Sequence, residues 1–216
     1  MKSASTAAAA CNRFERRRER TRQELLAAAT RVLAEKGVDR TKITDIAAAA
    51  DVGVGTFYLH FPDKEALFDA VVEETVRRLK ATVDVAREKA RGPLAKVQAA
   101  NRAFFRFARD NREVFKIVFG HAAAFNDLIR RAQALFIADL EKTVREGITS
   151  GAFAPLPPAL VAQAVVGMAT QVISWWTEHE SVPIETLIET TTALALHGMT
   201  PDAPAKGARH EGARHG

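Results

Sequence analysis

The sequence TKITDIAAAADVGVGTFYLHFPDK, residues 41–64, predicts two short helices separated by a tight turn. We expect the first over residues 42–50 and the second over residues 54–60. Each has a small or apolar face to bury, formed by Ile46, Ala47 and Ala50 on the first helix and by Phe57 and Phe61 on the second. Val52 fills the turn. Two short helices joined in this way form a helix-turn-helix.

The face of the second helix that remains outside carries no formal charge. It consists of Val54, Gly55, Thr56, Tyr58, Leu59 and His60. A small, uncharged surface of this kind can enter a groove without electrostatic repulsion. From these residues alone, an alternative is that the two helices are a corner of a larger helical bundle.

The stretch resembles the DNA-binding domain of the tetracycline-repressor-like (TetR) family. The resemblance rests on IA at 46–47, V at 52, GTFY at 55–58, HF at 60–61, KEAL at 64–67 and EKG at 35–37. It covers about residues 20–70, and beyond them only the number and lengths of the helices agree. It implies a homodimeric regulator that binds double-stranded DNA and responds to a small-molecule effector, most commonly as a repressor.

The resemblance also implies which residues contact DNA. The positions that contact phosphates are Lys42, Thr44, Tyr58, His60 and Lys64, and those that meet base edges are Val54, Gly55 and Thr56. Lys64 also lies near the start of a helix, where free N–H groups favour a phosphate. The recognition helix has no Arg, Lys, Asn or Gln for bidentate base contacts. Affinity must therefore depend on phosphates and on groove shape.

The sequence departs from the family pattern at three places. Asp51 stands where a turn glycine is usual, and aspartate tolerates the left-handed backbone conformation. Gly53 replaces the usual Ser or Thr cap of the recognition helix, which weakens the start of that helix by roughly a few tenths of a kcal/mol. Lys42 stands where a capping Thr or Ser is common, so we expect Thr41 to act as the cap instead.

A basic arm, residues 1–19, precedes the helix-turn-helix, and we expect it to be flexible. Between residues 13 and 22 the net charge is +4, from Arg13, Arg16, Arg17, Arg18, Arg20 and Arg22 against Glu15 and Glu19. Two interpretations remain open: contact with DNA phosphates or the minor groove, and a helix extension that is merely solvated.

Helical periodicity dominates the whole chain, and no clean alternating run predicts a strand. The predicted fold is all-α with about nine helices. It comprises a three-helix DNA-binding domain (residues 20–66), a helical effector and dimerisation bundle (67–199) and a disordered tail (200–216). The other expected helices are residues 21–36, a long one from 64 to the break at 91–93, 94–108, 114–119, 125–144, 159–178 and 184–197, with 147–158 as a loop.

The bundle is rich in aromatic residues, most of which we expect to be ordinary core. Two amides on apolar faces, Asn101 and Gln171, need hydrogen-bond partners, which a ligand or a neighbouring backbone group can supply. We expect a mainly apolar effector in a pocket of Asn101, Phe104, Phe105, Phe119, Met168, Gln171 and Trp175.

The last two helices have apolar faces wider than a single core needs, which predicts a four-helix dimer interface. Its expected residues are Val165, Val166, Ala169, Ile173 and Trp176 on one helix and Ile184, Leu187, Ile188, Thr191, Leu194 and Ala195 on the other. Two-fold symmetry then predicts a palindromic operator with half-sites about one helical turn or more apart.

Composition agrees with a globular protein that has an anionic partner: 216 residues, 47% hydrophobic, 26% charged and a net charge of +5. The single Cys11 fits a reducing cytosol, and the N-terminal residues lack the apolar core of a signal peptide, so we expect a cytoplasmic protein. Residues 159–177 have the length of a membrane span. Their alanines and amides favour a buried core or interface helix over a span.

No pattern predicts catalysis, a cofactor or a metal site. Gly53-Val54-Gly55 lacks the third glycine and the preceding strand of a nucleotide-binding loop, and His121, His179 and His197 lack metal-ligand spacing. We therefore expect a ligand-responsive repressor. Two alternatives remain: a DNA-binding or architectural protein without an effector, and a helical carrier whose basic face binds a membrane or an acidic partner.

Overall fold

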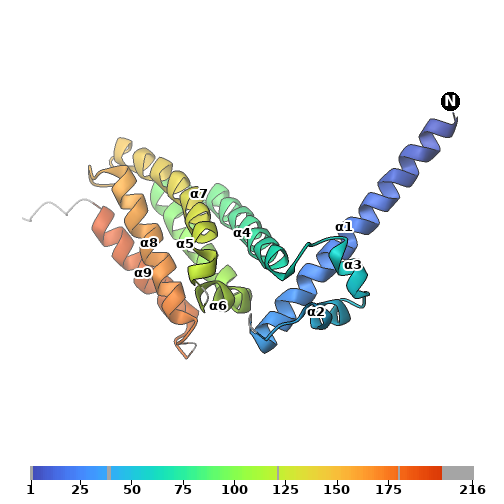
Figure 1. Ribbon diagram of the computed structural model, residues 1–216. Helices are drawn as coiled ribbons and strands as arrows, with labels where there is room; N and C mark the ends of the chain where they lie inside the picture. The colour runs from blue at the N-terminus through green and yellow to red at the C-terminus, as the bar shows by residue number, and fades with distance from the viewer. Residues whose placement is uncertain (1, 38–39, 121, 180, 201–216) are drawn as a thin grey trace, which may run out of the picture.

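The chain forms nine helices over the part that the computed structural model describes, residues 2–37, 40–120, 122–179 and 181–200. They are α1 (Lys2–Lys36), α2 (Ile43–Ala49), α3 (Val54–Tyr58), α4 (Lys64–Lys89), α5 (Pro93–Asp110), α6 (Arg112–Gly120), α7 (Ala122–Thr149), α8 (Pro158–Trp176) and α9 (Ile184–Met199). Figure 1 shows α1, α2 and α3 at one end, α5 to α9 bundled at the other, and α4 running between them. The all-α prediction is confirmed. The predicted disordered tail begins at Thr200, and its residues 201–216 lie outside the part of the chain that the structure describes.

The N-terminal unit is held together by one apolar core that α1 to α4 share. Leu25, Leu33, Ile46, Phe57 and Leu67 are at most 2% exposed. Full burial of a side chain of this size stabilises a fold by roughly 1.5–3 kcal/mol. Because α2 and α3 are too short to be stable alone, this core is what holds the recognition helix in place.

The end of α1 and the turn of the helix-turn-helix use left-handed backbone conformations. Gly37, with φ of 75°, ends α1 and donates its N–H to the carbonyl of Leu33 at 2.8 Å. Asp51 has φ of 54°, as predicted for a residue at the position of a turn glycine. Gly53 precedes α3 without a side-chain cap, also as predicted.

The start of α2 differs from the prediction, because Thr41 does not cap it. The Thr41 hydroxyl donates to the carbonyl of Gly37 at 2.6 Å. The backbone N–H of Lys42 instead donates to the Asp45 carboxylate at 3.1 Å. A hydrogen bond from Lys36, and then the one from Lys42, lower the pKa of Asp45 below its ordinary value. Asp45 therefore stabilises the start of α2 in place of an N-cap side chain.

Two helix limits differ more widely from those predicted. The first helix begins at Lys2 rather than near residue 21, so the expected arm continues α1. Alanine, arginine and glutamate are good helix formers, and they extend the helix past its core. At the other end of the chain, α7 runs to Thr149 and includes Gly147, which was expected to begin a loop. The carbonyl of Gly147 accepts hydrogen bonds from the N–H groups of Ala152 and Phe153, which close the turn after α7.

Gly147 is also a position that tolerates no side chain. A Cβ added there would lie 2.0 Å from Cδ2 of Phe153, whose ring is 3% exposed. We expect Gly147→Ala to lower the free energy of unfolding by about 2 kcal/mol, because overpacking a core typically costs 1–3 kcal/mol. Chemical denaturation measures this change, and adding Phe153→Leu should recover part of it. A stabilised Gly147→Ala chain, as for an unhindered helical glycine, would contradict the close packing.

The bundle is organised around α5. This helix packs against α4, α9 and α7, while α7 also packs along α8. Phe105, Ala108 and Ile173 are completely buried at its centre. The arrangement leaves one side of α8 and α9 at the outside of the bundle (Figure 1).

Candidate nucleic-acid interface and helical cavity

The outer face of α3 is exposed, as the helix-turn-helix pattern predicts. Val54 is 39% exposed, Tyr58 54% and Leu59 73%, and Gly55 is also exposed, while Thr56 is half-buried. Phe57 faces inward and contacts the rings of Tyr58 and Phe61, which fixes the rotation of α3 about its own axis. The result is a small uncharged surface that faces away from the core. Leu59 is the most exposed large apolar side chain of this surface, and no DNA contact was predicted for it.

The residues predicted to contact phosphates lie at the start of α2, at and just after the end of α3, and at the start of α4. Lys42 and Thr44, at the start of α2, are exposed. His60 and Lys64 are half-buried, and Lys64 donates from Nζ to the carbonyl of Thr41 at 3.3 Å and lies 5.5 Å from the ring centre of Phe68. Lys64, at the start of α4, therefore reaches the residue that precedes Lys42 at the start of α2.

The N-terminal part of α1 lies beside the end of α3. The guanidinium carbon of Arg22 is 5.1 Å from the ring centre of Phe61. Partial burial, with the positive charges of Arg18 and Arg22, lowers the pKa of His60 below its ordinary value. The lowered pKa favours the uncharged form of His60, and the charged groups near it are Arg18, Arg22 and Glu19.

The bundle contains an apolar cavity of about 170 Å³ that is partly open to solvent and is lined by residues of α4 to α9. Its lining includes Asn101, Phe104 and Phe119 of the predicted pocket, together with Phe115 and Phe136. The amide of Asn101 donates from Nδ2 to the hydroxyls of Thr191 and Thr192, both at 2.9 Å. The partner that this amide needs thus comes from α9 of the same chain.

The structure places the other four predicted pocket residues outside this cavity. Phe105 is completely buried in the core beside it. Met168 lines a surface groove between α8 and α9. Gln171 is exposed, and Trp175 is 45% exposed and stacks on the His179 ring at 4.2 Å. The prediction was wrong for Met168, Gln171 and Trp175 because α8 is rotated so that this side faces outward, and it was wrong for Phe105 because this side of α5 packs into the core.

Two charged residues, Arg87 and Lys96, line the described part of the cavity. Neither was predicted from the sequence. Arg87 continues the apolar stripe of α4, four residues after Val83, and a charged residue at such a position is the signal that could have revealed it. Lys96 Nζ lies 2.7 Å from a carboxylate oxygen of Glu146. Both cations lie near the ends of α4 and α5 that are remote from α3.

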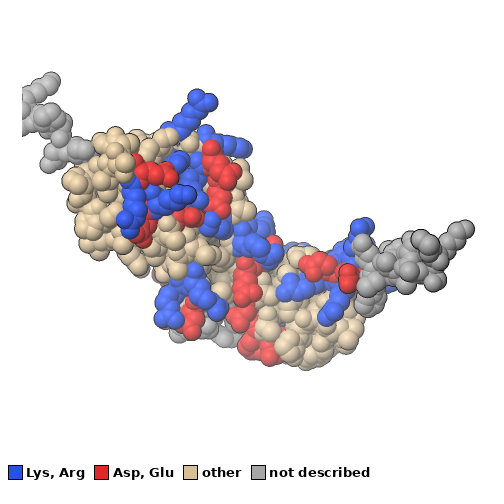
Figure 2. All heavy atoms as spheres, turned by 90° about the horizontal axis from the view of Figure 1, so that it is seen from above, with Lys and Arg blue, Asp and Glu red and all other residues tan. Residues whose placement is uncertain are grey.

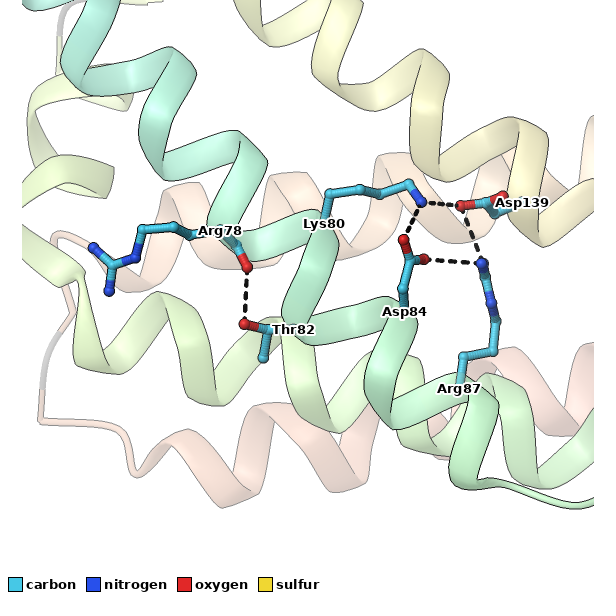
Figure 3. A network of polar contacts seen from close by, with 6 residues as sticks. All are labelled: Arg78, Lys80, Thr82, Asp84, Arg87 and Asp139. Carbon is cyan, nitrogen blue, oxygen red and sulfur yellow. Dashed lines mark hydrogen bonds and ion pairs between the residues drawn. The ribbon is translucent and has the colours of Figure 1, made fainter. Parts of the chain in front are cut away.

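A network of ion pairs joins α4 to α7 at this end of the cavity (Figure 3). Asp139 Oδ2 of α7 lies 2.8 Å from Lys80 Nζ and 3.1 Å from Arg87 Nη1. Asp84 binds the same two cations, at 2.6 and 2.9 Å. Partial burial alone would raise the pKa of Asp139, but hydrogen bonds from Lys80 and Arg87 lower it below its ordinary value. Arg87 is therefore held at the edge of the cavity by two carboxylates.

We expect Asp139→Asn to lower the free energy of unfolding at pH 7 by about 1–2 kcal/mol, since it leaves two partly buried cations with one carboxylate. Because the pKa of Asp139 is lowered in the folded chain, its contribution is full above the pKa of the unfolded carboxyl and is lost as the pH falls through the folded value. Urea denaturation from pH 7 down to pH 3 should show the two chains converging in acid. A constant difference would contradict the assignment.

The structure also corrects the predicted dimer residues. Five of them are at most 7% exposed and belong to the core of the chain: Ile173, Trp176, Ile184, Leu187 and Ile188. Thr191 and Ala195 are likewise buried. Val165, Val166 and Ala169 line the cavity, so only Leu194, 61% exposed, faces outward. The residues predicted to form the dimer interface therefore lie, apart from Leu194, on the inner face of α8 and α9.

The opposite face of α8 and α9 is exposed, and two thirds of its residues are apolar. On α8 it consists of Leu160, Ala164, Gly167, Gln171 and Trp175, and on α9 of Thr190, Ala193, Leu194 and His197. By length and composition α8 could cross a membrane, and only 17% of its most apolar window is buried in the chain. We call this surface the α8–α9 outer face.

An exposed recognition helix and a bundle with an internal cavity define the class of helix-turn-helix proteins that carry a second, helical domain. Comparison of the sequence with models of known families places both halves of the chain in this class. Residues 25–71 match the sequence model of bacterial regulatory proteins of the tetR family, and residues 90–199 match that of the tetracyclin repressor-like C-terminal domain. The chain belongs to the TetR family of DNA-binding transcriptional regulators.

Individual relatives agree with this assignment. The uncharacterized HTH-type transcriptional regulator YhgD of Bacillus subtilis is 26% identical over 181 residues, which span 82% of this chain and 95% of YhgD. The fatty acid degradation regulator FadR of Bacillus halodurans has a similar fold, with a TM-score of 0.74, 21% identity and coverage of 81% and 94%. FadR of B. subtilis, solved in complex with stearoyl-CoA, gives a TM-score of 0.70, 19% identity and coverage of 82% and 98%.

Proposed function

We propose that the protein is a repressor that binds a palindromic operator as a homodimer and is released by a small, mainly apolar effector. The observation that carries the proposal is the presence, in one chain, of an exposed α3 and an apolar cavity that share the helices α4 and α6. Val54, Gly55 and Thr56 are proposed to meet base edges, while Lys42, Thr44, Tyr58, His60 and Lys64 contact the flanking phosphates.

The homodimer is proposed to form through the α8–α9 outer face. Ala164, Gly167 and Ala193 allow two helices to approach closely, and Leu160 and Leu194 supply apolar area. The largest apolar patches on monomers are commonly interaction sites. A two-fold pairing of this face would form a four-helix interface and present two copies of α3 to one side of the DNA.

The effector is proposed to be an elongated apolar molecule with an anionic end. Valine, leucine and phenylalanine side chains form most of the cavity wall, and Arg87 and Lys96 are the charged side chains of its described lining. An anionic group could replace a carboxylate partner of either cation. The complex of B. subtilis FadR with stearoyl-CoA supports this chemistry, because that ligand joins a long acyl chain to an anionic group.

Coupling between cavity and DNA is proposed to pass through α6. Val114 and Val118 line the cavity, and the same residues belong to the core that includes Leu25 and Leu33 of α1. An effector that fills the cavity would displace α6 and α4, and with them the DNA-binding unit. Such a ligand shifts the equilibrium only by its difference in affinity between the two arrangements.

Selection of bound duplexes from a random DNA pool, followed by release assays, tests the proposal. We expect a palindromic sequence to be enriched, and the complex to dissociate with laurate or lauroyl-CoA at lower concentration than with dodecanol. Failure to enrich any duplex would contradict the DNA-binding role. Enrichment without release by any apolar compound would identify a regulator that lacks an effector.

A further inference from the structure

The DNA-binding unit is acidic when the start of α1 is left out. Residues 23–71 carry five Lys and Arg against eight Asp and Glu, a net charge of −3. The exposed face of α3 adds no positive charge to this balance. Affinity for DNA depends strongly on the neutralisation of phosphates by Lys and Arg, so this unit alone is poorly suited to a polyanion.

The missing positive charge lies in the ten residues that precede this unit. Residues 13–22 carry six arginines and two glutamates, a net charge of +4. Arg16, Arg17 and Arg18 are exposed, whereas Arg20 pairs with Glu24 at 3.4 Å. On the bundle face in Figure 2, by contrast, Lys and Arg side chains alternate with Asp and Glu. The basic segment of α1 is thus a concentrated source of positive charge next to the helix-turn-helix.

The fold fixes the position of this segment relative to α3. It is helical and continuous with the core part of α1, and it extends past α3 on the side remote from the bundle (Figure 1). Arg22 lies on the ring of Phe61, just after α3, and Arg16 lies about 9 Å further along the helix axis at 1.5 Å per residue. The arginines are therefore presented beside the C-terminal end of α3, near His60.

We propose that residues 16–18 of α1 bind the phosphate backbone of DNA next to the base pairs that α3 contacts, and that they supply a major part of the electrostatic affinity. This inference rests on the proposed DNA-binding role and adds a second contact to it. A recognition surface without bidentate side chains needs such a contact, because phosphate binding fixes the register of the complex without reading its sequence.

The test compares two full-length variants on the selected duplex. One is Arg16→Gln/Arg17→Gln/Arg18→Gln. The control, Arg91→Gln/Arg102→Gln/Arg131→Gln, removes the same charge from exposed arginines of the bundle end. Operator affinity is measured from 50 to 300 mM salt, with hydroxyl-radical footprinting of the complexes. Circular dichroism checks that both variants keep their helix content.

We expect the α1 variant to lose at least about tenfold in affinity at low salt, and its slope of log K against log salt to fall by about 2–3, at roughly 0.9 per phosphate contact. It should also lose protection of backbone positions that flank the α3 site, while the control keeps both. An unchanged slope, or an equal change in the two variants, would overturn the inference while leaving the proposed function intact. A wild-type chain that binds no duplex would instead contradict the proposed function itself.

Discussion

Replacing Gly55 by glutamate is expected to lower operator affinity by at least about 100-fold while the chain folds normally. Gly55 lies on the exposed face of α3, and no described atom lies within 4 Å of a Cβ built there. The side chain therefore has room in the free protein, and glutamate is a better helix former than glycine. In the complex its carboxylate would stand between α3 and the groove, close to phosphates. A loss of 100-fold is about 2.8 kcal/mol, which is within the cost of an unpaired charge at an interface.

A matched control separates this effect from the change in net charge. Ala81 is exposed on α4, and Ala81→Glu adds the same charge away from α3. Fluorescence anisotropy with the selected duplex should give near wild-type affinity for the control, and thermal melting should show both variants folded. Equal affinities for Gly55→Glu and the wild type would show that this face of α3 does not meet the DNA.

Replacing Gly167 by glutamate is expected to convert the proposed dimer to a monomer and to reduce operator affinity by about 10²–10⁴-fold. Gly167 lies on the α8–α9 outer face, with no described atom within 4 Å of an added Cβ. In a two-fold dimer the substitution would bring two carboxylates into an apolar interface. In a dimer, binding of one α3 to its half-site holds the second α3 at a high effective concentration near the other half-site. A monomer lacks this gain, which accounts for the size of the effect on DNA binding.

Sedimentation equilibrium measures the first part of this prediction, and titration of the duplex the second. Ala81→Glu again serves as the control, because it adds the same charge on another helix. A Gly167→Glu chain that remains dimeric at micromolar concentration would place the interface elsewhere. A monomer that still binds the whole palindrome at wild-type affinity would contradict the two-fold arrangement on DNA.

The helix-turn-helix could be predicted from the sequence because its signals are local. Phe57 and Phe61 define the buried side of α3, so the exposed side follows from helical geometry. Asp51 and Gly37 mark chain reversals through backbone conformations that few residue types adopt. Such features depend on neighbours only a few residues away, and the structure shows them where the sequence predicts them.

The orientation of α8 could not be predicted, because this helix has no charged residue and carries large apolar residues on both its inner and its outer side. Ile173 and Trp176 point inward and Leu160 and Trp175 point outward, yet all four are large apolar residues. Periodicity distinguishes the two sides of a helix only when one side is polar. Packing against α7 and α9 decides how α8 is rotated about its own axis. As a result, residues of α8 predicted for the dimer interface line the cavity, and residues of α8 predicted for the cavity lie on the outside. The cavity was better predicted on α5, where Asn101 and Phe104 follow a clear apolar stripe.

Dimethyl sulfate footprinting of the selected duplex tests most directly whether paired α3 helices lie in the major groove. The reagent modifies guanine N7, an atom of the major-groove edge. We expect two protected segments on one side of the duplex, separated by one helical turn or a multiple of it, and both absent with Gly55→Glu. Unprotected major-groove positions on a duplex that the protein binds tightly would contradict the account.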